Sequence, residues 1–320
     1  MMAGLVLVWG AAFPAIRLLG ESLDPFQITW FRYALFPLAY GAFLALRRRE
    51  VWATVSGRDW AVMGCLGLFG VVGYHFPLNW GMHGPQGVSS ATGAILVATG
   101  PIFIMLLAIL LGQEKLRPRA ALGSLVAFAG VTVVVLYGRG DADLDLAARA
   151  ALILLAPMSW AVYSVLAKPM VARYGGIFVT GVTMGMGTLS LLPLGVWYGV
   201  APLARLDAAG WGALLFLAIL STLAGYAVFN HALKHRRASD VAVFIYFQPV
   251  ISTVVGALVL DEPVTRWLLA GSSLVLAGIV LVNQARLAPP GAVGRPAAVE
   301  PAAPGPEPTP PARTPPGGQP

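Results

Sequence analysis

Two pairs of polar side chains have a spacing that would let them bind one small molecule together. His75 and Asn79 are four residues apart, as are Tyr226 and Asn230, so each pair lies on one face of a helix. Inside an apolar segment, an asparagine amide needs a hydrogen-bond partner, which is either a neighbouring helix or the polar end of a ligand. Both interpretations stay open for Asn79 and Asn230. His75 could carry a proton, and a histidine satisfied within the core is the alternative.

Aromatic side chains form a second group of candidates. Trp9 and Trp160 lie in the middle of apolar segments, where lining a cavity and packing against neighbours are both open interpretations. The complete set of predicted substrate-binding residues is Trp9, His75, Asn79, Trp160, Tyr163, Tyr226, Asn230, Phe247 and Gln248.

Prolines within apolar segments have a mechanical interpretation. Pro101 and Pro249 each remove one helix hydrogen bond and free a backbone carbonyl. We predict that these two prolines are hinges or kinks, and ordinary packing bends are the alternative. Three pairs of glycines are instead predicted to allow close helix packing: Gly123 with Gly130, Gly181 with Gly185, and Gly271 with Gly278.

Patterns typical of several kinds of enzyme are missing from the sequence. It has no phosphate-binding loop with a lysine, no HExxH zinc motif and no GxSxG nucleophile motif. The single cysteine, Cys65, excludes an internal disulfide and a cysteine metal cluster. No aspartate or glutamate lies near the middle of an apolar segment, where a proton-coupled pump usually has one. We therefore predict no catalytic residue, no metal and no cofactor, and keep a membrane-embedded enzyme as an alternative.

The elements that carry these residues are long apolar segments. Of the 320 residues, 58% are hydrophobic and 11% are charged, and the mean hydropathy is +0.76. Ordinary soluble domains have roughly 25% charged residues, so this composition predicts an all-α integral membrane protein. The expected ten spanning helices cover approximately residues 2–19, 26–46, 59–81, 87–111, 119–137, 149–168, 176–199, 209–233, 239–260 and 266–285.

Basic residues give the expected orientation. The net charge of +7 comes from short clusters between apolar segments, which orient helices and do not indicate nucleic-acid binding. One side collects Arg47, Arg48, Arg49, Arg58, Lys115, Arg117, Arg119, Lys168, Arg173, Lys234, Arg236 and Arg237. The positive-inside rule therefore places both termini in the cytoplasm. The first segment lacks the charged start of a signal peptide, so we expect a retained helix, and a longer true N-terminus stays open.

An internal repeat divides the chain. Trp9 matches Trp160 at an offset of 151 residues, and Pro101 matches Pro249 at an offset of 148. Each half holds five expected helices, so the second half enters the membrane from the opposite side and the repeats are inverted. The predicted domains are a first repeat at 1–137, a periplasmic linker at 138–148, a second repeat at 149–286 and a disordered proline-rich cytoplasmic tail at 287–320.

The sequence resembles the drug/metabolite transporter superfamily of the EamA type. The resemblance rests on Trp9-Gly10-Ala11-Ala12-Phe13 closed by Arg17, on Arg32-Tyr33, on Pro101 with Glu114, and on Trp160, Pro249 and Glu262-Pro263. It covers about residues 5 to 284. It implies ten helices in two inverted repeats around a central cavity that is lined mainly by helices 1, 3, 4, 6, 8 and 9.

The function that this resemblance implies is secondary transport. We expect small organic metabolites, amino acids or related compounds, to be exported across the inner membrane by alternating access. A phosphorylated metabolite or a nucleotide sugar is the alternative substrate, and it would need several cations in the cavity. The candidates are Arg17, Arg32 and Lys168, which lie near helix ends and can extend to water. The expected partners are the substrate and the lipid bilayer, while the coupling ion and the choice between monomer and homodimer stay open.

Overall fold

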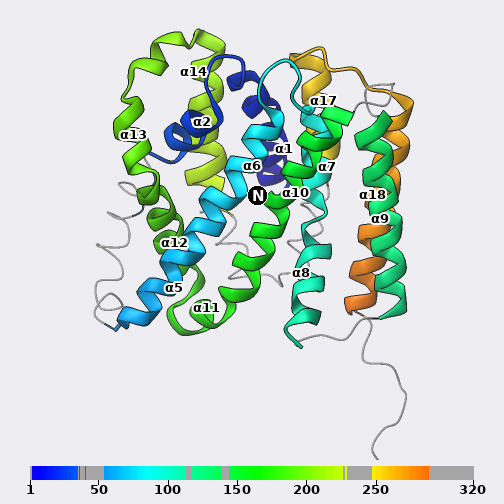
Figure 1. Cartoon of the computed structure of the whole chain (residues 1–320), viewed down its shortest axis with the longest axis horizontal. Helices are drawn as coiled ribbons and strands as arrows, with labels where there is room; N and C mark the ends of the chain where they lie inside the picture. Colours follow the sequence, from blue (N-terminus) through cyan, green and yellow to red (C-terminus); the bar gives the residue numbers. More distant parts are fainter. Residues whose placement is uncertain are drawn as a thin grey trace, which may run out of the picture. The chain divides into compact units, whose positions relative to one another are not determined.

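The structure is a computed structural model, and it describes residues 2–34, 36, 40, 54–112, 117–137, 144–225, 228 and 247–287. All regular structure within these ranges is helical, and they contain no strand (Figure 1). The predicted all-α class is therefore confirmed.

The elements of the first half reach Tyr137. They are α1 (Met2–Leu19), α2 (Pro25–Tyr33), α5 (Gly57–Gly67), the π-helical segment η1 (Leu68–Gly73), α6 (Tyr74–Met82), α7 (Ser90–Ala98), α8 (Gly100–Leu110) and α9 (Pro118–Tyr137). The elements of the second half follow. They are α10 (Leu144–Leu166), α11 (Lys168–Tyr174), α12 (Gly176–Ser190), α13 (Leu192–Tyr198), the 3₁₀ segment η2 (Ala201–Arg205), α14 (Ala208–Leu215), the π-helical segment η3 (Phe216–Ala224), α17 (Gln248–Val259) and α18 (Arg266–Leu287).

Five of these helical stretches are long and apolar enough to cross a membrane. They are Gly57–Met82, Ser90–Leu110, Pro118–Tyr137, Asp145–Leu166 and Arg266–Gln284. A sixth results if α12 and α13, which meet at 45°, form one bent span. Part of each of the expected helices at 26–46, 209–233 and 239–260 lies outside the described residues. The number of ten helices therefore stays a prediction.

Polar residues set where several helices begin. The Asp24 carboxylate accepts hydrogen bonds from the backbone N–H groups of Phe26 and Gln27, both at 2.9 Å, and the Gln27 Oε1 atom accepts one from the backbone N–H of Asp24 at 3.1 Å. This reciprocal cap, with Pro25 in the first turn, starts α2. Ser89 and Asp207 cap α7 and α14 in a simpler way.

Both halves contain a π-helical segment at an equivalent place. Shifted by 151 residues, Leu68 and Gly73 of η1 correspond to Ile219 and Ala224, which lie in η3. Each π-helical turn inserts an extra residue and changes which side chains the following turns present to their neighbours. The apolar pattern of the sequence does not reveal these segments, because each continues an α-helix without a break in hydrophobicity.

Glycines allow α9 and α18 to pack closely, side by side at one edge of Figure 1. A Cβ added to Gly130 would lie 2.6 Å from the carbonyl oxygen of Gly271, and one added to Gly123 would lie 2.7 Å from that of Gly278. The prediction for these four glycines is confirmed. For Gly185 it is wrong, because a Cβ added there would meet nothing within 4 Å.

Arg17, which was expected to extend to water, forms an ion pair with Glu262. The Arg17 Nε atom lies 3.8 Å from Glu262 Oε1, and the two side chains are 16% and 14% exposed. Arg17 also donates to the carbonyl oxygen of Met82 at 2.9 Å. Glu262 accepts from the backbone N–H of Ser90 at 2.9 Å and from its hydroxyl at 3.0 Å. This network therefore joins the end of α1, the end of α6, the start of α7 and the loop after α17.

A second cluster lies at the other end of the span Gly57–Met82. Asp59 accepts hydrogen bonds from the Arg173 guanidinium at 2.8 Å and from the Tyr174 hydroxyl at 2.5 Å. The bond to Asp59 is the main cause that raises the pKa of the Tyr174 phenol above its ordinary value. Arg173 and Arg17 therefore lie at opposite ends of this helical span.

Candidate functional site

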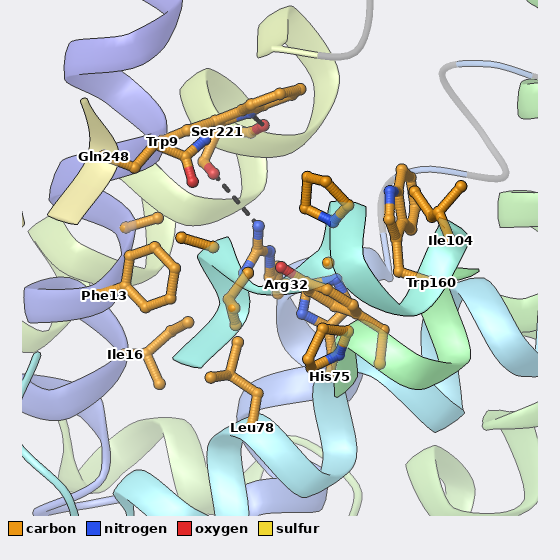
Figure 2. A pocket seen from close by; sticks show the side chains of 17 residues that line it. Trp9, Phe13, Ile16, Arg32, His75, Leu78, Ile104, Trp160, Ser221 and Gln248 are labelled. Carbon is orange, nitrogen blue, oxygen red and sulfur yellow. Dashed lines mark hydrogen bonds between the residues drawn. The ribbon is translucent and has the colours of Figure 1, made fainter. Parts of the chain in front are cut away.

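A cavity of about 230 Å³ lies among α1, α2, α6, α7, α8, α10, η3 and α17. Figure 2 shows the side chains that line it. Apolar groups make up most of the wall, and they include Phe13, Ile16, Leu78 and Ile104. Small-molecule sites are typically concave and mostly apolar, with a few polar groups that fix the orientation of the ligand. This cavity has that composition.

Five of the predicted residues line the cavity. They are Trp9 from α1, His75 from α6, Pro101 from α8, Trp160 from α10 and Gln248 from α17. Residues far apart in the sequence thus meet at one place. That they bind substrate stays a prediction.

Arg32 is the charged residue among the described residues that line the cavity. It is the eighth residue of α2, and 7% of it is exposed. Its Nε atom donates to Thr222 Oγ1 at 3.0 Å, and its Nη2 atom donates to Ser221 Oγ at 3.2 Å. Figure 2 shows the guanidinium in the middle of the lining side chains, with the bond to Ser221 drawn as a dashed line. From the sequence, Arg32 was a candidate cation only for the alternative, phosphorylated substrate, and its side chain was expected to extend to water.

The π-helical segment η3 supplies both partners of Arg32. Ser221 and Thr222 are fully buried, and the indole N–H of Trp9 donates to the backbone carbonyl of Ser221 at 2.9 Å. Trp9 therefore holds the backbone of the segment whose hydroxyls position the guanidinium. The sequence signal that could have revealed Arg32 is a lone cation two turns inside an apolar helix, since such residues usually face the interior of a bundle.

His75 contributes a polar edge beside Arg32. Its Nε2 atom lies 2.6 Å from the hydroxyl of Tyr33, and 3% of the residue is exposed. Its Nδ1 atom is buried and has no hydrogen-bond partner among the described residues. A buried nitrogen of this kind is costly to leave unpaired, so a bound ligand or water is the expected partner.

Trp160 belongs to an aromatic stack. Its ring is stacked on Tyr163 with centroids 5.0 Å apart, and it meets Tyr74 edge-on at 5.8 Å. The hydroxyl of Tyr163 forms a hydrogen bond with Thr183 Oγ1 at 3.1 Å. Tyr163 is not among the residues that line the cavity, so it supports Trp160 from behind.

Other predicted site residues lie elsewhere. Asn79 donates to Thr29 Oγ1 at 2.9 Å and is away from the cavity lining, as the interhelical alternative expected. Phe247 is 55% exposed and is not part of the lining. Tyr226 and Asn230 lie outside the described residues.

Pro101 and Pro249 both lie in the first turn of a helix, α8 and α17 respectively. A proline costs little there, because the missing N–H would have no partner within the helix. Pro101 follows the break between α7 and α8, and Pro249 is buried outside the cavity lining. Hinge motion at either proline stays a prediction.

Comparison with known proteins identifies the family. The profile of the EamA-like transporter family matches residues 1–136 and 148–284. The chain belongs to this family. An uncharacterized transporter of Archaeoglobus fulgidus is 30% identical over 292 residues, which are 89% of this chain and 98% of that protein. A probable terminal-alkyne amino-acid exporter of Streptantibioticus cattleyicolor is 30% identical over 286 residues, covering 88% of this chain and 92% of the exporter.

A solved crystal structure has the same fold as this EamA-like chain. It is 20% identical, has a TM-score of 0.60, and the match covers 88% of this chain and 94% of the other. Together these findings identify a multi-pass membrane transporter for a small-molecule substrate, and the names of the family and of its relatives indicate transporters and not enzymes. The predicted resemblance is confirmed.

Proposed function

We propose that this EamA-like protein exports small organic metabolites, amino acids or related compounds, across the inner membrane by alternating access. The cavity between the helices is the proposed binding site, and Trp9, His75, Trp160 and Gln248 are its proposed contacts. The amino-acid exporter among its relatives supports the substrate class and the direction of transport.

One observation carries this proposal: both halves of the chain contribute to the cavity wall. Trp9, Arg32 and His75 come from the first matched segment, and Trp160, Ser221 and Gln248 come from the second. In carriers built from repeats, the substrate lies at the interface between the repeats, where a rocking motion can expose it to either side. A cavity lined by only one half would not couple ligand binding to such a motion.

The proposal includes the predicted architecture. We propose two inverted repeats of five helices at 1–137 and 149–286, a periplasmic linker between them, a proline-rich tail from residue 287, and both termini in the cytoplasm. The two separate matches of the family profile support the division. The equivalent positions of η1 and η3 support the repeat.

A phosphorylated metabolite or nucleotide sugar remains the alternative substrate. Phosphate groups carry up to two negative charges and usually bind to more than one cation. Among the described residues that line the cavity, Arg32 is the one arginine, and no lysine accompanies it. The cavity therefore favours a ligand with less negative charge.

Solute counterflow into liposomes tests the proposed function. Purified protein is reconstituted into vesicles preloaded with one unlabelled solute, and uptake of the labelled solute is followed for amino acids, other organic acids and phosphorylated metabolites. We expect counterflow with members of the first two groups and recovery of the solute unchanged. Chemical conversion of the solute, or counterflow restricted to phosphorylated compounds, would contradict the proposal.

A further inference from the structure

We propose that Arg32 binds the carboxylate of the transported molecule and that this carboxylate is the group the cavity requires. The inference rests on the proposed transport function and names the chemical feature of its substrate. Four features of the structure lead to it: the burial of Arg32, the absence of a described counter-ion, the unpartnered nitrogen of His75, and a difference between the two halves.

Among the described residues, the buried charge of Arg32 meets the ring of Tyr33, whose centroid lies 5.6 Å from the guanidinium carbon, but no opposite charge. A guanidinium stays protonated in proteins, so burial cannot remove its charge. Its hydrogen-bond partners Ser221 and Thr222 are neutral hydroxyls, and no carboxylate of the described residues forms an ion pair with it. A charge buried at membrane depth is costly unless an opposite charge approaches it. An anionic ligand in the cavity would supply that charge.

The neighbouring groups limit the size of the anion's charge. The Nδ1 atom of His75, buried in the same wall, has no partner among the described residues and can hydrogen-bond to an oxygen or to an N–H of a ligand, depending on its tautomer. Apart from Ser221 and Gln248, the rest of the described wall is apolar or aromatic, including Phe13, Leu78 and Trp160. One guanidinium and one imidazole fit a single carboxylate on an apolar body better than a doubly charged phosphate.

The second half of the chain has no counterpart of this arginine. At the offset of 151 residues that relates Trp9 to Trp160, Arg32 corresponds to Thr183. Thr183 is fully buried and bonds to the backbone carbonyl of Val179 at 2.8 Å, as threonines in helices commonly do. The equivalent place in the second half is therefore filled by a small neutral residue. A cation that appears in one half only is better explained by a ligand than by helix packing.

The amino group of an amino acid has no comparable partner. No carboxylate is among the described residues that line the cavity, so an ammonium group would rely on the Gln248 amide and the aromatic faces of Trp160 and Tyr74. We therefore expect removal of the carboxylate to weaken binding far more than removal of the amino group.

Binding of four probes to the purified wild-type protein tests this expectation. L-Leucine, L-leucinamide and 4-methylpentanoate share an apolar body and differ in which charged group they retain, while acetate tests for an anion site without an apolar requirement. Affinities come from thermal shift and titration calorimetry. We expect leucinamide to bind at least about tenfold more weakly than leucine, and 4-methylpentanoate to bind within about tenfold of leucine. Leucinamide binding as tightly as leucine, or no binding of leucine and of 4-methylpentanoate, would overturn the inference. Acetate binding as tightly as leucine would overturn the apolar body inferred for the ligand.

Variants then assign the effect to the guanidinium. We expect Arg32→Gln to weaken leucine binding by about 100-fold and Arg32→Lys by about tenfold, because lysine keeps the charge but loses the planar fork. Both variants should reduce the preference for leucine over leucinamide, a ratio that a purely structural defect would leave unchanged. The matched control is Arg149→Gln, since Arg149 is partly buried and bonds to the carbonyl of His83 at 3.1 Å, away from the cavity lining. An unchanged ratio in Arg32→Gln would overturn the inference.

The outcomes separate this inference from the proposed function. Wild-type protein that gives counterflow of amino acids, while Arg32→Gln keeps the full preference for leucine over leucinamide, would overturn the role of Arg32 and leave the transport function intact. Wild-type protein that gives no counterflow with any amino acid or organic acid would overturn the proposed function and, with it, the role of Arg32.

Discussion

At the scale of single residues, the same side chain type has different roles at different places in this protein. Asn79 and Gln248 are both buried amides, yet Asn79 bonds to Thr29 on a neighbouring helix while Gln248 lines the cavity. Trp9 and Trp160 both line the cavity, but only for Trp9 does the described structure give a hydrogen bond from the indole, to the carbonyl of Ser221. Asn79 and Gln248 are thus distinguished by the direction of the side chain, because both are buried.

Replacement of Asn79 by alanine tests the structural role of this amide. We expect the free energy of unfolding to fall by about 0.6 to 1.7 kcal/mol, because the bond to Thr29 is lost in an environment without water. Substrate affinity should stay within about twofold, as the residue does not line the cavity. A double-mutant cycle with Thr29→Ala, measured by thermal or denaturant unfolding in detergent, gives the coupling energy directly. Weaker substrate binding without any loss of stability would support the original binding hypothesis for Asn79.

At the scale of elements, small residues decide how closely helices approach. The contact between α9 and α18 uses Gly123 and Gly130 opposite Gly278 and Gly271, so two backbones meet without side chains between them. Close backbone contact is a main source of helix association in a membrane. Lipid tails are as apolar as a large side chain, so burying such a side chain between helices gives no hydrophobic gain. The spacing in the sequence indicated these glycines, and the structure shows which of them meet.

The exchange of Gly130 for alanine should therefore destabilise the protein. The added methyl group would lie 2.6 Å from the carbonyl oxygen of Gly271, and such overpacking typically costs about 1 to 3 kcal/mol. The matched control is Gly185→Ala in α12, where the methyl group meets nothing within 4 Å. That variant should be neutral or more stable by up to about 1 kcal/mol, because alanine favours the helix. Equal stability of both variants in a denaturant titration would mean that α9 and α18 are not in close contact.

At the scale of the whole molecule, two polar clusters mark the opposite ends of the span Gly57–Met82. Asp59 with Arg173 lies at one end of the span Gly57–Met82, and Arg17 with the carbonyl of Met82 lies at the other. If the first end is cytoplasmic, as the distribution of basic residues predicts, the network of Arg17, Glu262 and Ser90 faces the periplasm. The open question for the described helices is therefore which of these two ends faces the cytoplasm.

Reporter fusions at loop residues can decide that choice. Fusions at Arg48, Arg117, Arg173 and Arg237 should report the cytoplasm, and fusions at Asp24, Asp143 and Asp207 should report the opposite side. The physical reason is the excess of arginine and lysine in the first set of loops, which resist translocation. Measurement of alkaline phosphatase and fluorescent-protein activities in matched fusions would test each loop. One reversed loop would contradict the inverted repeat, whereas reversal of all loops would contradict only the predicted orientation.

Composition and repetition by themselves determined the class of this protein. A chain with 58% hydrophobic residues cannot keep its long apolar segments in water, and matched positions such as Trp9 with Trp160 identify the repeat before any coordinates are known. Glycine spacing and helix caps such as Asp24 are also local, so their roles could be predicted from neighbouring residues. Glycine spacing and helix caps depend on residues that are close to each other in the sequence.

Only the tertiary structure decided which side chains share the cavity. Arg32 is separated from Ser221 and Thr222 by about 190 residues, and its direction depends on how α2 packs against η3. The π-helical segments change the face that Tyr74, His75 and Ser221 present, and they leave no trace in the apolar pattern. Helical periodicity gives the face of one helix, but the neighbour that this face meets is set by the packing of all helices together.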